Sequence, residues 1–418
     1  MKSSVLRELR SPVVALAVLS ARVFAAQSPD CEGVIARGNL VACAEANSPL
    51  LAEEQAAFRA GEGRREAARP FLPSNPSVSG SVASRSGPDA RAVNWYLTLS
   101  QELEIGGQSG LRVDAADREL SALNHQVSVA RAEVAQQVWL AYFELLSARQ
   151  RVILATQVDK AIAEVAATVR AMATAGLAGT VEATVADAAA VKSGREVLQA
   201  ERSTLAAELR LRSLLGASSR PAISGELEPL RWQGAPQTQR PEAAALKAMR
   251  EALSRRVVLL RRANVPNPTV SLFAQNDGFN EQVLGVGLSL PIPLPQPLGR
   301  TRAGEIAEAV AFEEKQGAAL QQLERALSAE LALARADADT GTQILALYSP
   351  ARITDAMQGL TAIASQLRAA RLPVREALSS QQSLVEFLNA EVEARHALCV
   401  ASVRLVRASG GSLEGGDL

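Results

Sequence analysis

Two glutamates, Glu182 and Glu376, occupy matching places 194 residues apart (376 − 182), and an alanine follows each of them. Each glutamate comes just after a short turn-forming segment and opens a helical pattern. If several copies of the chain surround a narrow opening, such carboxylates would form acidic rings that attract cations. The simpler interpretation is a solvated glutamate in the first turn of a helix, where the helix dipole favours negative charge.

Other residue types that could carry chemistry are few and scattered. The two histidines, His125 and His396, lie in helical patterns and lack the cysteine and histidine spacing of a zinc site. The sequence contains neither a phosphate-binding glycine loop nor a nucleophile elbow. We therefore expect no enzyme activity, no cofactor and no bound metal.

The three cysteines are Cys31, Cys43 and Cys399. Outside the cytoplasm, Cys31 and Cys43 could close a small disulfide loop. A lipid-anchored N-terminus at Cys31 is the alternative, although Ser28-Pro29-Asp30 lacks the small apolar residues that a lipoprotein signal needs. Cys399 lies in a helical pattern and is expected to be a small core residue.

The composition and the N-terminal segment indicate which classes of protein are possible. The 418 residues carry a formal net charge of +0, so no basic excess favours nucleic acid as a partner. Aromatic residues make up only 3%, and Ala, Leu, Val, Glu, Arg and Gln dominate, which is typical of long packed helices. Lys2, Arg7 and Arg10 precede an apolar stretch, so residues 1–26 are predicted to be a signal peptide.

Alternating residues predict two strand hairpins, at 76–105 and 268–294. The openings Asn75-Pro76 and Asn267-Pro268 lie 192 residues apart (267 − 75). Leu97 and Leu99 fall on an apolar face, whereas Glu102 and Glu104 fall on the polar face and are expected to line the lumen of a barrel. Closing a membrane barrel takes about eight strands, so four strands imply an oligomer. A soluble sandwich fragment with one wet face is the alternative.

Apolar residues at three- and four-residue spacing predict coiled-coil-like helices after each hairpin. We expect a helix over 110–175, roughly 65 residues or ~100 Å long, and a return helix over 181–215. The second copy predicts a long helix over 301–367, kinked or divided at Pro350, and a return helix over 373–408. Shorter helices are expected at 34–69 and 241–263. The chain is thus predicted to hold two structural repeats, 27–235 and 236–418.

This duplicated plan resembles the TolC-like outer-membrane efflux proteins, from about residue 34 to residue 410. The local markers are the two Asn-Pro openings, the run LGVGLSLPIP at 284–293 followed by Gly299-Arg300, and IAEA at 306–309. The segment SQELEIGG at 100–107 is similar to the heavy-metal branch, of the cobalt–zinc–cadmium or copper–silver type.

The resemblance implies a mainly α-helical fold with transmembrane β-strands. Three chains would give a twelve-stranded outer-membrane barrel that continues into a helical barrel in the periplasm. The implied partners are two further copies, outer-membrane lipid, a periplasmic adaptor (membrane fusion) protein and an inner-membrane transporter of the RND type. The implied function is a passive exit duct of a tripartite efflux system for heavy-metal cations.

The resemblance also implies roles for particular residues. Acidic residues near the tips line the periplasmic constriction in this family, and Glu182 and Glu376 stand at the matching positions. Val185 and Ser379 occupy the places of a second acidic position, so any cation-attracting ring would be weaker here. Apolar residues exposed at the tips are expected to contact the adaptor: Gly176, Leu177, Leu372 and Val374.

Two other functions stay open at the level of sequence. The same fold serves as an exit duct for drugs or for type I protein secretion. A periplasmic coiled-coil structural protein without a pore would share the helical pattern.

Overall fold

The computed structural model describes most of the chain beyond the predicted signal peptide, residues 1–26, which lies outside the described residues. Hairpin tips at 87–90 and 277–280, the boundary predicted at 235/236, and Pro293, Pro295, Pro297, Gly299 and Arg300 also lie outside them. The described residues are 31, 34–86, 91–216, 222–231, 240–276, 281–292, 294 and 302–413.

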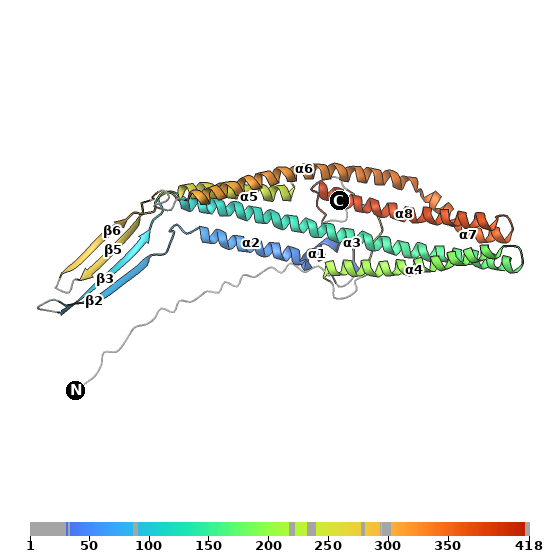
Figure 1. Cartoon of the computed structure of the whole chain (residues 1–418), viewed down its shortest axis with the longest axis horizontal. Coiled ribbons are helices and arrows are strands. Elements are labelled where there is room, and N and C mark those ends of the chain that lie inside the picture. The colour runs from blue at the N-terminus through green and yellow to red at the C-terminus, as the bar shows by residue number, and fades with distance from the viewer. Residues whose placement is uncertain are drawn as a thin grey trace, which may run out of the picture.

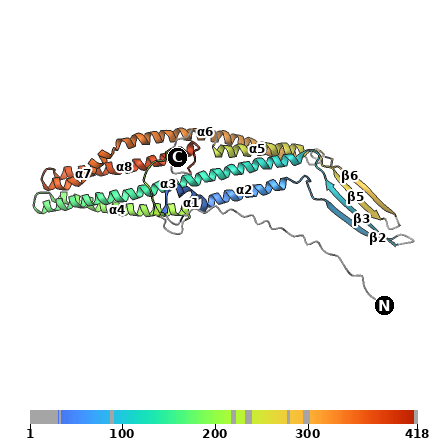
Figure 2. The same cartoon turned by 180° about the vertical axis from the view of Figure 1, so that it is seen from behind.

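The molecule is elongated, with a strand sheet at one end and two helical hairpin tips at the other (Figures 1 and 2). The C-terminal segment returns to the middle of the molecule. The elements in order are β1 (Val34–Ile35), η1 (Arg37–Asn39), α1 (Leu40–Asn47), α2 (Pro49–Ala68), β2 (Ser77–Ser86), β3 (Arg91–Glu102), α3 (Gln108–Thr174), α4 (Thr180–Leu215), β4 (Ala222–Ile223), α5 (Pro241–Arg262), β5 (Thr269–Asn276), β6 (Gln282–Ser289), α6 (Ala303–Leu347), α7 (Pro350–Arg368) and α8 (Val374–Ala408).

Strands β2, β3, β5 and β6 form one antiparallel sheet in that order, so the two hairpins join through β3 and β5. Val78 pairs with Leu99, Leu99 with Leu272, and Leu272 with Val286. These four side chains share one face and are all exposed. The sheet therefore presents a continuous apolar face that the described chain does not cover.

Two strands are shorter than the hairpin ranges 76–105 and 268–294. Strand β3 ends at Glu102, although the backbone N–H of Leu103 still donates to the carbonyl of Pro268 at 2.9 Å. Gly107 then takes a positive φ of 71° and leads into α3. Strand β6 ends at Ser289, two residues before Pro291, because proline has no N–H for a strand ladder.

Helix α3 is 67 residues long and is the central helix of the helical part. It packs against α2 and α5 near the sheet and against α4, α7 and α8 toward the tips. Trp139, Tyr142 and Phe143 are fully buried at its middle, and the indole N–H of Trp139 donates to the carbonyl of Leu413 at 2.9 Å. This aromatic cluster fastens the C-terminal segment to the middle of the bundle.

Two predicted helices are broken. The range 301–367 is divided into α6 and α7 at residues 348–349, because Ser349 is the N-cap of α7 and Pro350 occupies its first turn. The range 34–69 contains β1, η1, α1 and α2; Ser48 accepts a bond from the N–H of Leu51, and Pro49 begins α2. The parallel pairing of β1 with β4 was not predicted, since two-residue strands have no periodicity to detect.

Each lateral edge of the molecule carries an exposed apolar row. Helix α4 has α3 on one side, and its outer flank exposes Val191, Leu198 and Leu205. Helix α6 exposes Phe312, Leu333 and Leu347. The two edge strands of the sheet are β2 and β6.

A network of ion pairs joins the start of α5 to α6 and α8. Arg240 lies between Glu242 and Glu330, at 3.0 and 2.8 Å, and Arg407 also pairs with Glu242. Burial alone would raise the pKa of Glu242, but its own backbone N–H, Arg240 and Arg407 outweigh burial and lower it. The carboxylate is therefore held in its charged form.

Candidate sites at the helical tips and the strand–helix junction

The two helical tips have the same backbone geometry. In the first, the N–H of Leu177 donates to the carbonyl of Met172 at 2.8 Å, and Gly176 has a φ of 71°. In the second, the N–H of Arg371 donates to the carbonyl of Gln366 at 3.0 Å. Ala370 there has a φ of 52°, the left-handed region in which an alanine is strained. The two tips therefore repeat the same turn 194 residues apart.

The two glutamates predicted for a mouth ring have different surroundings. The Glu182 carboxylate accepts a 2.9 Å bond from the N–H of Gly179 and so caps the start of α4. Glu376 is exposed in the first turn of α8. The structure thus shows a local capping role for Glu182. Both carboxylates lie at helix N-termini, where negative charge is favourable.

Of the four residues expected to contact an adaptor, two are exposed. Leu177 is 74% exposed and Gly176 beside it is exposed as well. Leu372 is half-buried and packs against the core between the helices. Val374 is only 7% exposed, so the expectation that it is available for a partner is wrong. Its apolar side chain faces the neighbouring helices because it begins the buried stripe of α8.

The two glutamates predicted for a barrel lumen also differ. Glu102 accepts a 2.8 Å bond from the side-chain amide of Asn267. The side chain of Glu104 is only 8% exposed and forms an ion pair with Arg112, whose guanidinium also donates to the carbonyl of Pro70 at 3.2 Å. A side chain covered within a single chain cannot line a lumen, so that expectation is wrong for Glu104.

Sequence reasoning missed the polar network at this strand–helix junction. The amide of Gln108 donates to the side-chain oxygen of Asn267 at 3.1 Å and accepts a 3.0 Å bond from the N–H of Gly106. Asn267 therefore connects the end of β3 to the start of α3. The repeated Asn-Pro opening was the signal that could have drawn attention to Asn267.

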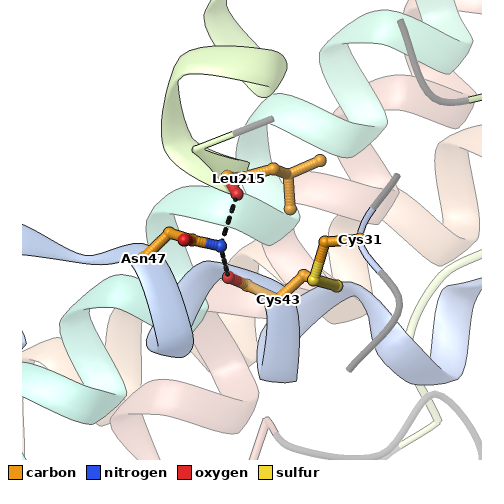
Figure 3. Close-up of a disulfide and its surroundings, with 4 residues drawn as sticks. All are labelled: Cys31, Cys43, Asn47 and Leu215. Carbon is orange, nitrogen blue, oxygen red and sulfur yellow. Dashed lines mark hydrogen bonds between the residues drawn. A yellow bond between two sulfur atoms is a disulfide. The ribbon is translucent and has the colours of Figure 1, made fainter. Parts of the chain in front are cut away.

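The predicted alternatives for Cys31 are separated by the structure. Cys31 and Cys43 form a disulfide, with their Cα atoms 5.7 Å apart (Figure 3). Next to it, the amide of Asn47 donates to the carbonyls of Cys43 and Leu215, at 3.0 and 2.9 Å. A thiol in a disulfide is not free for lipidation. The arrangement joins the beginning of the described chain to the end of α4.

The remaining candidates for chemistry are isolated. Burial raises the pKa of the Cys399 thiol to about 12, as befits a core residue. Among the described residues, no group of three His, Cys, Asp or Glu could hold a metal ion. None of the helices in the described ranges is both long enough and apolar enough to cross a membrane.

Comparison with known proteins finds similarity to outer-membrane efflux proteins and to metal-resistance proteins. Residues 40–217 match the family described as Outer membrane efflux protein. The cobalt-zinc-cadmium resistance protein CzcC of Cupriavidus metallidurans is 29% identical over 202 residues, which is 46% of this chain and 48% of CzcC. The nickel and cobalt resistance protein CnrC of the same organism is 26% identical over 268 residues, 61% of this chain and 63% of CnrC. The chain thus spans about half of CzcC and under two thirds of CnrC.

The fold is also similar to that of a solved protein. The solved structure of CusC, described in connection with transmembrane channel formation, superimposes with a TM-score of 0.76 at 16% identity, covering 90% of this chain and 92% of CusC. These matches confirm the resemblance to the outer-membrane efflux proteins and to their heavy-metal resistance members. They also confirm the mainly helical fold class with a small strand sheet, and the description of the matched family names the outer membrane, in agreement with the expected location. CusC, whose fold this chain shares, is itself described as forming a transmembrane channel.

Proposed function

We propose that the chain is the outer-membrane channel of a tripartite efflux system, a passive exit duct for heavy-metal cations. The observation that carries the proposal is the sheet at the end of a long helical bundle. Its apolar face is exposed, and the outer edges of β2 and β6 pair with no other strand among the described residues. A face of this kind fits outer-membrane lipid, and two free edges fit a shared barrel.

A homotrimer is the assembly that we propose. Three copies supply twelve strands if β2 of one copy pairs with β6 of the next, which closes the ring without a free edge. Helix α4 lies on the same side of the molecule as β2, and α6 on the same side as β6 (Figure 1), so the same contact would cover the apolar side chains that these helices expose. The helical wall would then close along with the barrel.

Heavy-metal cations are proposed as cargo because the names of both curated relatives specify metal resistance. The partners would be a periplasmic adaptor and an inner-membrane transporter of the RND type, which supplies the energy. Exposed Gly176 and Leu177 are the proposed adaptor contacts. Glu376, together with Glu182, would give the mouth a negative potential, and Glu102 would do so at the base of the barrel.

Two experiments test this proposal. Light scattering corrected for detergent should find three chains per particle in protein extracted from the outer membrane. A deletion strain should become sensitive to cobalt, zinc, cadmium or nickel ions, and the gene supplied in trans should restore resistance. A soluble monomer or dimer would refute the channel.

The same experiments separate the two other functions. A trimer whose deletion changes sensitivity to organic drugs, or abolishes secretion of a protein, but leaves metal tolerance intact would favour a drug or type I secretion duct. Recovery of the protein only in the soluble periplasmic fraction would favour a structural coiled-coil protein.

A further inference from the structure

A cleft opens between the two helical hairpins, beginning about one turn beyond the tips. Residues of α4 and α8 form its walls, and Ile162 of α3 contributes to its floor; the cavity has a volume of about 290 Å³. Four aliphatic side chains give it apolar surface: Ile162, Val185, Leu378 and Val385. The polar residues that line it include Lys192, Ser193, Glu196, Gln381, Gln382 and Glu386.

One polar group in this cleft lacks a partner. Gln381 is only 4% exposed, and its side-chain oxygen Oε1 is buried without a hydrogen-bond partner in the described part of the chain. An unsatisfied buried acceptor destabilises the folded state. The position therefore invites a group that donates a hydrogen bond.

Several polar groups around the cleft already have partners. The hydroxyl of Ser193 donates to Asp159 at 2.6 Å, and the amide of Gln382 donates to Glu386 at 2.9 Å. Lys192 pairs with Glu196 on its own helix, at 3.9 Å. Because Oε1 of Gln381 is an acceptor without a partner in the described part of the chain, a ligand that complements it must bring its own N–H or O–H.

The internal repeat explains how the acceptor was left over. Gln381 corresponds to Asp187 in the first repeat (187 + 194 = 381), and Asp187 forms an ion pair with Arg170. The residue corresponding to Arg170 is Ala364 (170 + 194 = 364), which is buried. The second repeat thus retains a polar acceptor at this place, but a methyl group replaces the guanidinium that serves it in the first.

The net charge of the residues that line the cleft indicates which hydrogen-bond donor a ligand should carry. Lys192, Glu196 and Glu386 sum to a formal charge of −1 (1 − 2) at neutral pH. We propose that the cleft binds a small amphiphilic ammonium compound. Its N–H donates to Oε1 of Gln381, its positive charge faces Glu386, and its apolar body packs against Val185, Leu378 and Val385. This site lies in the helical wall and is separate from the duct function proposed above.

The test uses benzylammonium as probe and the full-length protein held in an amphipol, so that free detergent does not compete. Saturation-transfer NMR and calorimetry should detect one saturable site per chain. Benzoate and benzyl alcohol, which carry the same ring with a negative charge or none, should bind at least about tenfold more weakly. Equal binding of the three compounds would overturn the proposal. The same holds if none of them binds saturably, which would leave only water at Gln381.

Variants locate the site. Gln381→Leu keeps the size but removes the acceptor, and should weaken benzylammonium binding about tenfold. Gln381→Glu keeps an acceptor and adds charge, so it should bind benzylammonium more tightly and keeps the test valid if the leucine variant does not fold. Gln321→Leu, on exposed α6, is the matched control and should bind like the parent. Unchanged benzylammonium binding in both Gln381 variants would contradict the assignment of the site to Gln381.

Discussion

The side-chain amide of Asn267 lies 2.8 Å from the carboxylate of Glu102, although 165 residues separate them in the chain. The bond links the start of the second hairpin to the end of the first. Gln108 contacts the same asparagine, so the relationship extends into the first turn of α3. The direction in which the sheet leaves the helices therefore depends on the side chain of Asn267, which belongs to the second repeat and bonds to residues of the first.

Replacing Asn267 with Asp should weaken this junction. The new carboxylate would face Glu102 with like charge and lose the bond that the amide donates, a loss of about 1.5–3 kcal/mol for a bond to a charged group. The temperature at which the assembled protein dissociates should fall. Asn264→Asp, at an exposed position three residues earlier, is the control and should leave that temperature unchanged. Equal behaviour of both variants would contradict the role of Asn267.

The shared backbone geometry of the two tips predicts opposite effects for two opposite substitutions. Ala370→Gly should stabilise the second hairpin by about 1 kcal/mol, because glycine accepts the left-handed backbone without strain. Gly176→Ala should destabilise the first hairpin by a similar amount, since nothing crowds Gly176 and only its φ of 71° opposes a side chain. Hydrogen exchange at the tip amides measures both. The tips would not be equivalent if the two changes had the same sign.

The disulfide predicts a defined labelling pattern. Iodoacetamide should modify Cys31 only after reduction, Cys43 only after reduction and unfolding, and Cys399 only after unfolding, because Cys43 and Cys399 are both fully buried. Intact mass should show no acyl chain on Cys31. Cys31→Ser should cost about 3 kcal/mol by the loop-entropy estimate, which is measurable as a lower unfolding midpoint. An acylated Cys31 would contradict the disulfide.

The acidic mouth predicts a change in ion selectivity. Glu376→Gln should lower the preference of single-channel currents for cations, because it removes an exposed charge from the second tip of every chain. Glu182→Gln should act in the same direction and preserve α4, since glutamine also serves in a capping box. Glu201→Gln, on the same helix but far from the tip, is the control. Currents that are identical in all three variants would exclude the ring.

The lowered pKa of Glu242 predicts a dependence of stability on pH. A carboxyl whose folded-state pKa lies below its unfolded value, about 4.3, contributes stability above that value and loses it as pH falls through the folded pKa. Glu242→Gln should therefore be less stable than the parent at neutral pH, with the difference shrinking in acid. Denaturation midpoints at pH 7 and pH 4 measure this. Glu314→Gln, on the exposed side of α6, should show no such trend.

Periodicity predicted the long elements well and the contacts between them poorly. Apolar residues at helical spacing, such as Val134 and Val138 four residues apart, are enough to predict α3, because the buried stripe of a helix is a local property. The junction of Asn267 with Glu102 and Gln108 depends on segments about 160 residues apart, which periodicity cannot relate. For the same reason, alternation placed Glu104 on a polar face, whereas Arg112 from the next element buries it.

The edges of the sheet have a consequence for mixed populations. Because β2 and β6 differ, every closed ring would need each copy to offer both a sound β2 and a sound β6. A chain with only one damaged edge could still attach to its neighbours but would leave the ring open. Such a chain, produced beside the normal one, would act as a dominant inhibitor, and the fraction of intact channels would fall as the cube of the fraction of normal chains.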